Sequence, residues 1–136
     1  MQPSVVRLAG VYDADGTVLG EVSYFLRAQV GRAHCDLCDI THGRIRERSD
    51  WRDVRDGLPI PFETFHRDDQ PSEVRAAAHG AVPVVVGSLD DGSHLLLVGP
   101  AELATCAGSP QRLVEELEAA LRRHDLRWPD RSAADA

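Results

Sequence analysis

Two closely spaced cysteines are the side chains of this chain best suited to chemistry. Cys35 and Cys38 form a CxxC pair within residues 33–44, AHCDLCDITHGR. Two thiols at this spacing close a small disulfide ring or bind one metal ion, and both uses depend on the thiolate. The segment is too polar for a packed core, so we expect it at the surface or along a cleft. The pair predicts a thiol redox site with one nucleophilic and one resolving cysteine.

A metal site is the main alternative for the same segment. Tetrahedral zinc accepts mixed sets of cysteine and histidine ligands. A feasible set for zinc or copper consists of Cys35, Cys38 and His42. Cys106 or His66 would supply a fourth ligand. Cys106 also fits a simpler interpretation, that of a small apolar side chain buried in the core.

An acidic pair follows the first apolar run of the chain. Asp13 and Asp15 stand in LAGVYDADGTVLG, which resembles the first motif of the haloacid dehalogenase-like phosphatases. That resemblance implies Asp13 as nucleophile, Asp15 as acid/base and Mg²⁺ as cofactor. The chain contains no lysine for the phosphate-stabilising position of those enzymes. We therefore expect no Mg²⁺-dependent phosphatase activity, and we expect Asp15 to cap a helix over residues 17–30.

Composition limits the classes of function. Hydrophobic residues make up 43% of the 136 residues and charged residues 27%, as in an ordinary globular domain. The chain has 22 acidic and 15 basic residues, a net charge of −7, which argues against nucleic-acid binding. No apolar run is long enough to span a membrane, and no secretory leader is visible, so we expect a cytoplasmic protein. Three cysteines, an odd number, do not resemble a secreted disulfide framework.

Strands and helices alternate along the chain. Short apolar runs rich in β-branched residues predict strands, and apolar residues at helical spacing predict helices. Ser49 is expected to cap a short helix over WRDVRDG. The expected strands are residues 5–12, 62–66, 82–89 and 95–98, and the expected longer helices are residues 17–30, 73–79 and 110–123.

The C-terminal part has the clearest local signals. Asp91 and Gly92 separate two apolar runs and predict a β-hairpin between antiparallel strands. The pair Gly99-Pro100 ends the second of these strands. Ser109 is placed to cap the last helix, with Pro110 at its first position.

The order of elements predicts an α/β fold. A βαβ half followed by a ββα half gives a small sandwich with a four-stranded mixed sheet. We expect one domain over residues 1–127, with an insert containing the CxxC pair at about 33–58 and a tail at 128–136. This order resembles the thioredoxin-like superfamily in its minimal, glutaredoxin-like form. The resemblance is most specific over residues 70–123, and it implies that Pro83 is the cis proline of that family.

The cysteine pair departs from the pattern of that superfamily. Its redox pair directly follows the first core strand, where residues 13–19 of this chain, DADGTVL, contain no cysteine. A second alignment treats residues 17–30 as an extra helix and brings Cys35 behind a very short strand. Only this alignment lets Pro83 line the thiol site.

The stretch CDLCDITHG also resembles a CxLCxLTHG-type signature of small bacterial thioredoxin-like proteins whose role is unknown. That resemblance supplies no reaction. The redox interpretation implies a protein or small-molecule thiol or disulfide as partner, no cofactor, no nucleic acid and no membrane. A non-catalytic interaction module is the remaining alternative.

Overall fold

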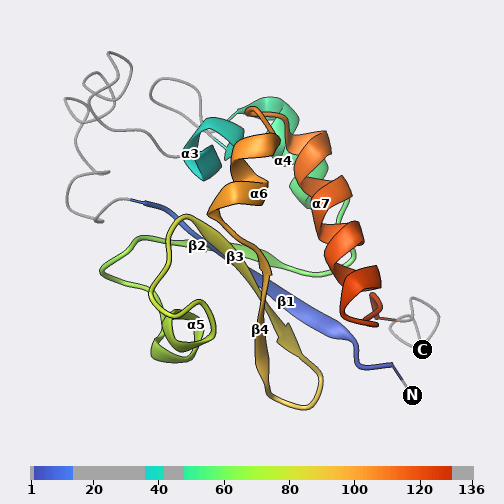
Figure 1. Cartoon of the computed structure of the whole chain (residues 1–136). Coiled ribbons are helices and arrows are strands. Elements are labelled where there is room, and N and C mark those ends of the chain that lie inside the picture. Colours follow the sequence, from blue (N-terminus) through green and yellow to red (C-terminus); the bar gives the residue numbers. More distant parts are fainter. Residues whose placement is uncertain (1, 14–35, 42–47, 130–136) are drawn as a thin grey trace.

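The computed structural model describes residues 2–13, 36–41 and 48–129, and these form an α/β unit with a four-stranded mixed sheet (Figure 1). The described part of the chain contains five helices. In chain order the elements are β1 (Val5–Val11), α3 (Asp36–Thr41), α4 (Ser49–Asp56), β2 (Phe62–Phe65), α5 (Ser72–Ala77), β3 (Val84–Leu89), β4 (His94–Val98), α6 (Pro100–Thr105) and α7 (Pro110–Arg123).

The sheet has the order β2-β1-β3-β4 and confirms the four expected strands. Strand β1 is central, parallel to β2 and antiparallel to β3. Strands β3 and β4 form the antiparallel hairpin that the Asp-Gly turn predicts. A parallel pair needs a crossover between its strands, and the chain between β1 and β2 contains α3 and α4.

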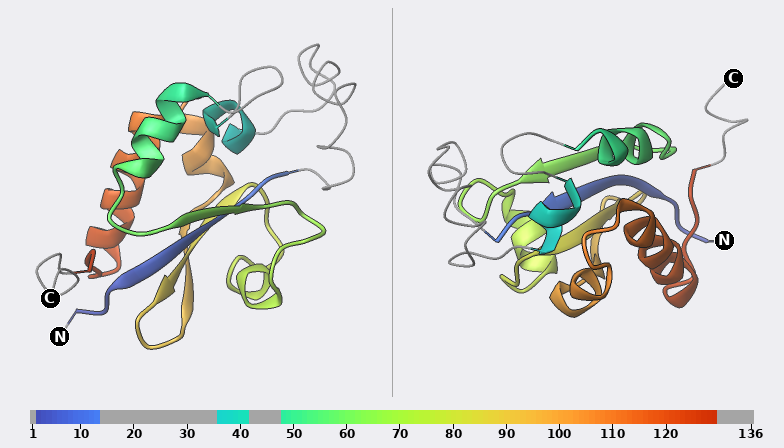
Figure 2. Two further views of the ribbon diagram at one scale, coloured as in Figure 1. Left: turned by 180° about the vertical axis from the view of Figure 1, so that it is seen from behind. Right: turned by 90° about the horizontal axis from the view of Figure 1, so that it is seen from above.

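Helices cover the two faces of the sheet unequally. Helices α3, α4, α6 and α7 contribute to one large core cluster with the inner side chains of the strands. Helix α5 lies on the opposite face, where Val74 and Ala78 pack against Val84 and Val86 (Figure 2). The strands are therefore apolar on both faces where helices cover them, as expected for a sheet buried between layers.

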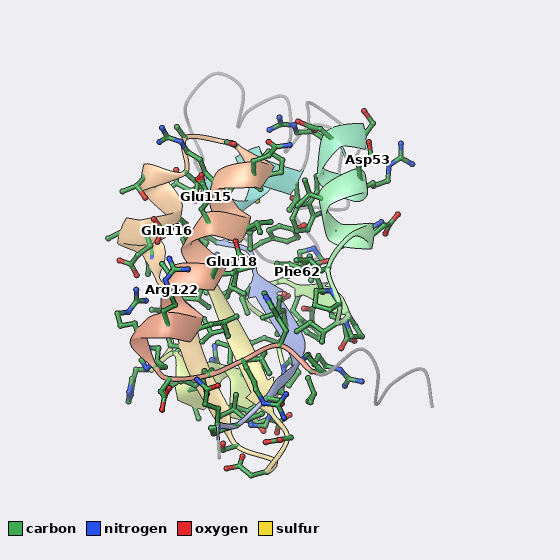
Figure 3. The ribbon with its side chains drawn as sticks, turned by 90° about the vertical axis from the view of Figure 1, so that its right-hand side faces the viewer. Asp53, Phe62, Glu115, Glu116, Glu118 and Arg122 are labelled. Atoms are coloured by element: carbon green, nitrogen blue, oxygen red, sulfur yellow. The ribbon has the colours of Figure 1, made fainter. Side chains whose placement is uncertain are left out.

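The last helix forms as its sequence predicts. The Ser109 side chain accepts a hydrogen bond from the backbone N–H of Arg112 at 3.2 Å, and Pro110 opens the helix. The buried stripe contains Leu113 and Leu117. Figure 3 shows the interior between α7 and α4, where Phe62 lies, with Asp53 on the outer side of α4.

One local expectation is wrong, and one helix was not expected. Ser49 is the first residue of α4, and the N-cap position belongs to Arg48, which makes no side-chain cap bond. Asp50 takes up the first-turn contacts instead, because its Oδ1 accepts from the backbone N–H of Trp51 at 2.9 Å. Between β4 and α7 the chain also forms α6, which begins directly after the expected break at Gly99. Glu102 Oε1 accepts a hydrogen bond from the N–H of Gly99 at 2.9 Å and closes the first turn of α6.

The two ends of the described chain lie side by side. The N–H of Val5 donates to the carbonyl of Arg127 at 3.0 Å, and Ser4 forms a bridge with the same residue. Leu126 is buried, and Trp128 packs against the large core cluster. The packed chain thus continues into the segment we assigned to the tail. The expected helix at residues 17–30 and its cap Asp15 lie outside the described residues. Among the helices that are described, none has the length and apolarity needed to cross a membrane.

Candidate functional site

Helix α3 carries Cys38 at the margin of the core. Leu37 and Ile40 are fully buried and belong to the large core cluster, and Cys38 is partly buried against the same cluster. The expectation that this segment is too polar for packing is therefore wrong for one side of α3. Cys38 is therefore intermediate in burial, on a helix whose other face packs into the core. Cys35 and His42 lie outside the described residues.

Gly10 in β1 lies close to a side chain of α3 and a side chain of β2. A Cβ atom at Gly10 would lie 3.1 Å from Leu37 Cδ2 and 2.9 Å from Phe62 Cε1. Only a glycine leaves room for both side chains at this point of the strand. The absence of a side chain at Gly10 therefore allows the Leu37 side chain of α3 to pack onto the second half of β1.

A buried hydrogen bond joins the same two elements. The hydroxyl groups of Tyr12 and Thr41 lie 3.0 Å apart, and both residues are buried. Tyr12 directly follows β1, and Thr41 stands one helical turn after Cys38. This contact brings α3 to the carboxyl ends of the parallel strands β1 and β2. In open α/β sheets ligands commonly bind beyond these ends.

A histidine and an aspartate occupy the same edge. The N–H of Tyr12 donates to the carbonyl of Phe65 at 2.8 Å, so His66 lies beside Tyr12, with ring centroids 5.7 Å apart. His66 Nδ1 is 2.8 Å from Asp69 Oδ2, and the backbone N–H of His66 donates to Asp69 Oδ1 at 2.6 Å. Burial acts to raise the pKa of Asp69, but the hydrogen bonds from the His66 ring and backbone outweigh it and lower this pKa. The carboxyl group is therefore ionised at neutral pH.

An ion pair lies next to this group. Asp13, the nucleophile of the phosphatase alternative, has its Oδ1 3.2 Å from a guanidinium nitrogen of Arg67. The side chain of Asp13 is 36% exposed. Its postulated partner in that chemistry, Asp15, lies outside the described residues. The expectation that no phosphatase activity exists stays a prediction.

Pro83 reaches the same edge from β3. The peptide bond between Val82 and Pro83 is cis. Pro83 immediately precedes Val84, the first residue of β3, which pairs with Val11 of β1. The start of β3 and the end of β1 therefore lie together, and Pro83 is close in the fold to the Tyr12 position.

Cys106 is a core residue. It caps the C-terminus of α6, is fully buried, and its Sγ donates to the carbonyl of Glu102 at 3.5 Å. Burial, followed by the nearby carboxylate of Glu116, raises the pKa of this thiol to about 11. Metal binding requires the thiolate, which this environment disfavours. The expected burial of Cys106 in the core is confirmed. Its place in a metal site stays a prediction, because Cys35 and His42 lie outside the described residues.

Sequence reasoning missed most of this edge. Tyr12 was assigned only to a strand, Asp69 had no assigned role, and His66 was considered only as a fourth metal ligand. A usable signal existed: Tyr12 and His66 stand at the ends of two strands expected in one sheet, and Asp69 follows His66 at a spacing of three residues.

Comparison with known proteins assigns no relative to the chain. No protein-family model matches it, and neither the curated proteins nor the solved structures contain a significant match. Its function must therefore be argued from the site itself.

Proposed function

We propose that the chain is a thiol-based redox protein with a thioredoxin-like fold, in which Cys35 and Cys38 exchange a disulfide with thiols of a protein or a small molecule. The mixed sheet of order β2-β1-β3-β4, with helices between β1 and β2 and after β4, supports this fold assignment, as does the cis bond at Pro83, directly before β3. The hairpin of β3 and β4, followed by α6 and α7, supports it further, because the resemblance rests most specifically on that region.

The position of Cys38 is the observation that carries the functional part of the proposal. Its thiol is partly buried on a helix that Leu37 and Thr41 attach to the end of β1. Pro83 and His66 come to the same edge of the sheet from two other strands. Reactive thiols are partially exposed, and the intermediate burial of Cys38 is consistent with that requirement.

The third cysteine is unsuited to the exchange. Exchange begins with a thiolate attacking a disulfide sulfur, so a thiol with a raised pKa attacks slowly. Cys106 is fully buried and its pKa is raised to about 11. The reaction therefore falls to Cys35 and Cys38, as nucleophilic and resolving thiols.

Thiol counting and metal analysis on one anaerobic preparation test the proposal. Free thiols are counted before and after reduction, and bound metal is measured by elemental analysis. We expect a reversible disulfide between Cys35 and Cys38 without bound metal. Cys38→Ser should abolish exchange with a dithiol while the protein stays folded, and Cys106→Ala should leave exchange intact as the matched control.

Two other results would reject the redox proposal. Stoichiometric zinc or copper with all thiols masked, lost in His42→Ala, would establish the metal alternative. Thiols that neither form a disulfide nor bind metal would leave a non-catalytic interaction module.

A further inference from the structure

We propose that the sheet face on which α5 lies binds a small protonated amine with an apolar body, in a pocket beside that helix. Helix α3 and Cys38 belong to the core on the other face of the sheet, so this inference stands apart from the proposed redox function. Three observations support it: an uncovered part of the sheet, polar side chains without partners, and a carboxylate whose charge is not compensated.

Helix α5 is too short to cover its face of the sheet. It has six residues, and its buried side chain Val74 packs in the smaller core cluster with Val84 and Val86. Ser88 stands two residues after Val86 and therefore on the same face of β3, but it is only partly buried. The face is thus covered at the start of β3 and open near its end.

The register of the strands places three polar side chains in one row across this open part. Arg7 of β1 is paired with Ser88 of β3, and Ser88 is paired with His94 of β4. Directly paired residues have neighbouring side chains on one face of the sheet. Within the described part of the chain, Ser88 and His94 form no side-chain hydrogen bond or ion pair. A ligand can therefore use both groups without breaking a contact of the protein.

A pocket lies between this row and α5. Its volume is about 280 Å³, and Ala9, Phe65, Pro71 and Val74 line it with apolar atoms. Sites for drug-sized ligands usually measure about 300–1,000 Å³. The pocket therefore suits a smaller molecule, with a single ring or a short alkyl chain against the apolar wall.

The charges around the pocket favour a cation. Arg7 Nε lies 2.9 Å from Glu63 Oε1, so these two charges compensate each other. Glu73 also lines the pocket, and among the described residues its carboxylate accepts only from the Ser72 hydroxyl, at 3.4 Å. One negative charge is therefore left over. An anionic ligand would meet the carboxylates of both glutamates, whereas a ligand with one positive charge complements the pocket.

A primary ammonium group fits the hydrogen-bonding groups that remain. It carries one positive charge and three N–H donors. The carboxylate of Glu73, the hydroxyl of Ser88 and the unprotonated nitrogen of a neutral His94 ring are acceptors, and all three residues line the pocket. The apolar body of the amine then lies against Phe65 and Val74, where burial of its surface contributes to binding.

Unspecific attraction to an acidic protein is the competing explanation. The chain has a net charge of −7 and attracts any amine weakly to its surface. Such attraction needs no apolar body and is spread over all exposed carboxylates. Three probes separate the two cases: phenethylamine has a ring and an ammonium group, hydrocinnamate has a ring and a carboxylate, and ethylamine has an ammonium group without a ring.

An NMR titration of the isotope-labelled full chain measures the binding of each probe. We expect phenethylamine to bind with a Kd of about 1 mM, as is usual for so small a ligand in an open pocket. It should shift the amide signals of Ala9, Phe65 and Ser88. Hydrocinnamate lacks the positive charge and ethylamine lacks the apolar body, so each should bind at least about tenfold more weakly.

Substitutions in the pocket test its location. Glu73→Gln should weaken phenethylamine binding by up to about fivefold, because an exposed ion pair contributes little. Ser88→Val removes an acceptor and places a larger side chain in the pocket, and it should weaken binding further. Glu118→Gln removes the same charge from the exposed side of α7, which packs on the other face of the sheet, and should bind like wild type.

Three results would overturn the inference. Ethylamine binding as tightly as phenethylamine, with shifts spread over the surface, would show unspecific attraction. Tighter binding of hydrocinnamate would show that the charge of the ligand is wrong. Folded Glu73→Gln and Ser88→Val proteins that both bind phenethylamine like wild type would place the amine elsewhere. The disulfide of the redox proposal is measured on the thiols and is unaffected by any of these results.

Discussion

A methyl group on Gly10 tests the contact between β1 and α3. In Gly10→Ala the new Cβ would lie 2.9 Å and 3.1 Å from two ring carbons of Phe62 and 3.1 Å from Leu37 Cδ2. Carbon atoms do not normally approach this closely, so the ring, the leucine or the strand must shift. Leu37 precedes Cys38 in α3. The substitution therefore disturbs the packing of the helix that carries Cys38 as well as the core.

The expected cost is set by two opposing effects. Overpacking a well-filled core costs about 1–3 kcal/mol. Replacing glycine by alanine also reduces the conformational entropy of the unfolded chain, which stabilises the folded state by about 0.4–1 kcal/mol. A net loss of roughly 1–2 kcal/mol follows. For a chain of 136 residues this corresponds to a fall in Tm of about 3–7 °C.

Thermal and urea unfolding of two glycine variants measure the effect. Gly57→Ala is the matched control, because a Cβ there would lie 3.5 Å from its nearest neighbours, the carbonyl oxygens of Asp53 and Val54. Gly57 has φ −81° and ψ −10°, which alanine adopts without strain. The control should be neutral or more stable than wild type by up to about 1 kcal/mol. In Gly10→Ala, Phe62→Leu should recover part of the lost stability, because it removes the ring edge that the methyl group meets.

Equal stability of the two alanine variants would refute this reasoning. It would mean that Leu37 and Phe62 do not close over Gly10, and that α3 is not packed against β1 as the contacts indicate. The attachment of Cys38 to the end of β1 would then lose its main support.

Three further predictions concern single side chains. In the native, reduced protein at pH 8, iodoacetamide should label Cys38 and spare Cys106, because the pKa of the Cys106 thiol is raised to about 11. Peptide mass mapping identifies the labelled cysteines. Rapid labelling of Cys106 would contradict its burial. Ser109→Ala should lower the free energy of unfolding by about 1 kcal/mol, because it removes the N-cap of α7; an unchanged urea midpoint would argue against the cap. The folded pKa of Asp69 lies below its ordinary value of 3.8, so the stability that Asp69 contributes is present above about pH 4 and is lost as the pH falls through the folded pKa. In Asp69→Asn the free energy of unfolding should fall slightly less steeply below pH 4 than in wild type; the effect is small because the Asp69 side chain is 53% exposed. An identical pH dependence in the two proteins would show that the contact with His66 does not contribute to stability.

Local sequence patterns were sufficient for most of the sheet. Strands β1 and β3 are short apolar runs rich in valine, which is a local signal for a strand. The hairpin depends on Asp91 and Gly92 alone, and α7 on the cap at Ser109 and on leucines at helical spacing. Helix α6 was missed because its six residues are too few to show a period. Its formation depends on the burial of Leu103 and on the bond from Gly99 to Glu102.

Some features of the candidate site are likewise visible in the local sequence, and others depend on the fold. The sequence alone singled out Cys38 and recognised Cys106 as a candidate for the core, because thiol spacing and an apolar context are local properties. The partnership of Tyr12 with Thr41 joins residues 29 positions apart, and that of Tyr12 with His66 depends on the parallel pairing of β1 and β2.

Reactive side chains can therefore be recognised in the sequence of this protein, whereas the tertiary structure decides which residues lie next to them in space. Strand pairing and helix packing bring together groups that have no relation along the chain, and the close approach at Gly10 shows how one missing side chain determines where a helix rests. The lowered pKa of Asp69 and the raised pKa of Cys106 both follow from those contacts. Such properties arise from distances of a few ångströms between atoms, which a linear pattern does not specify.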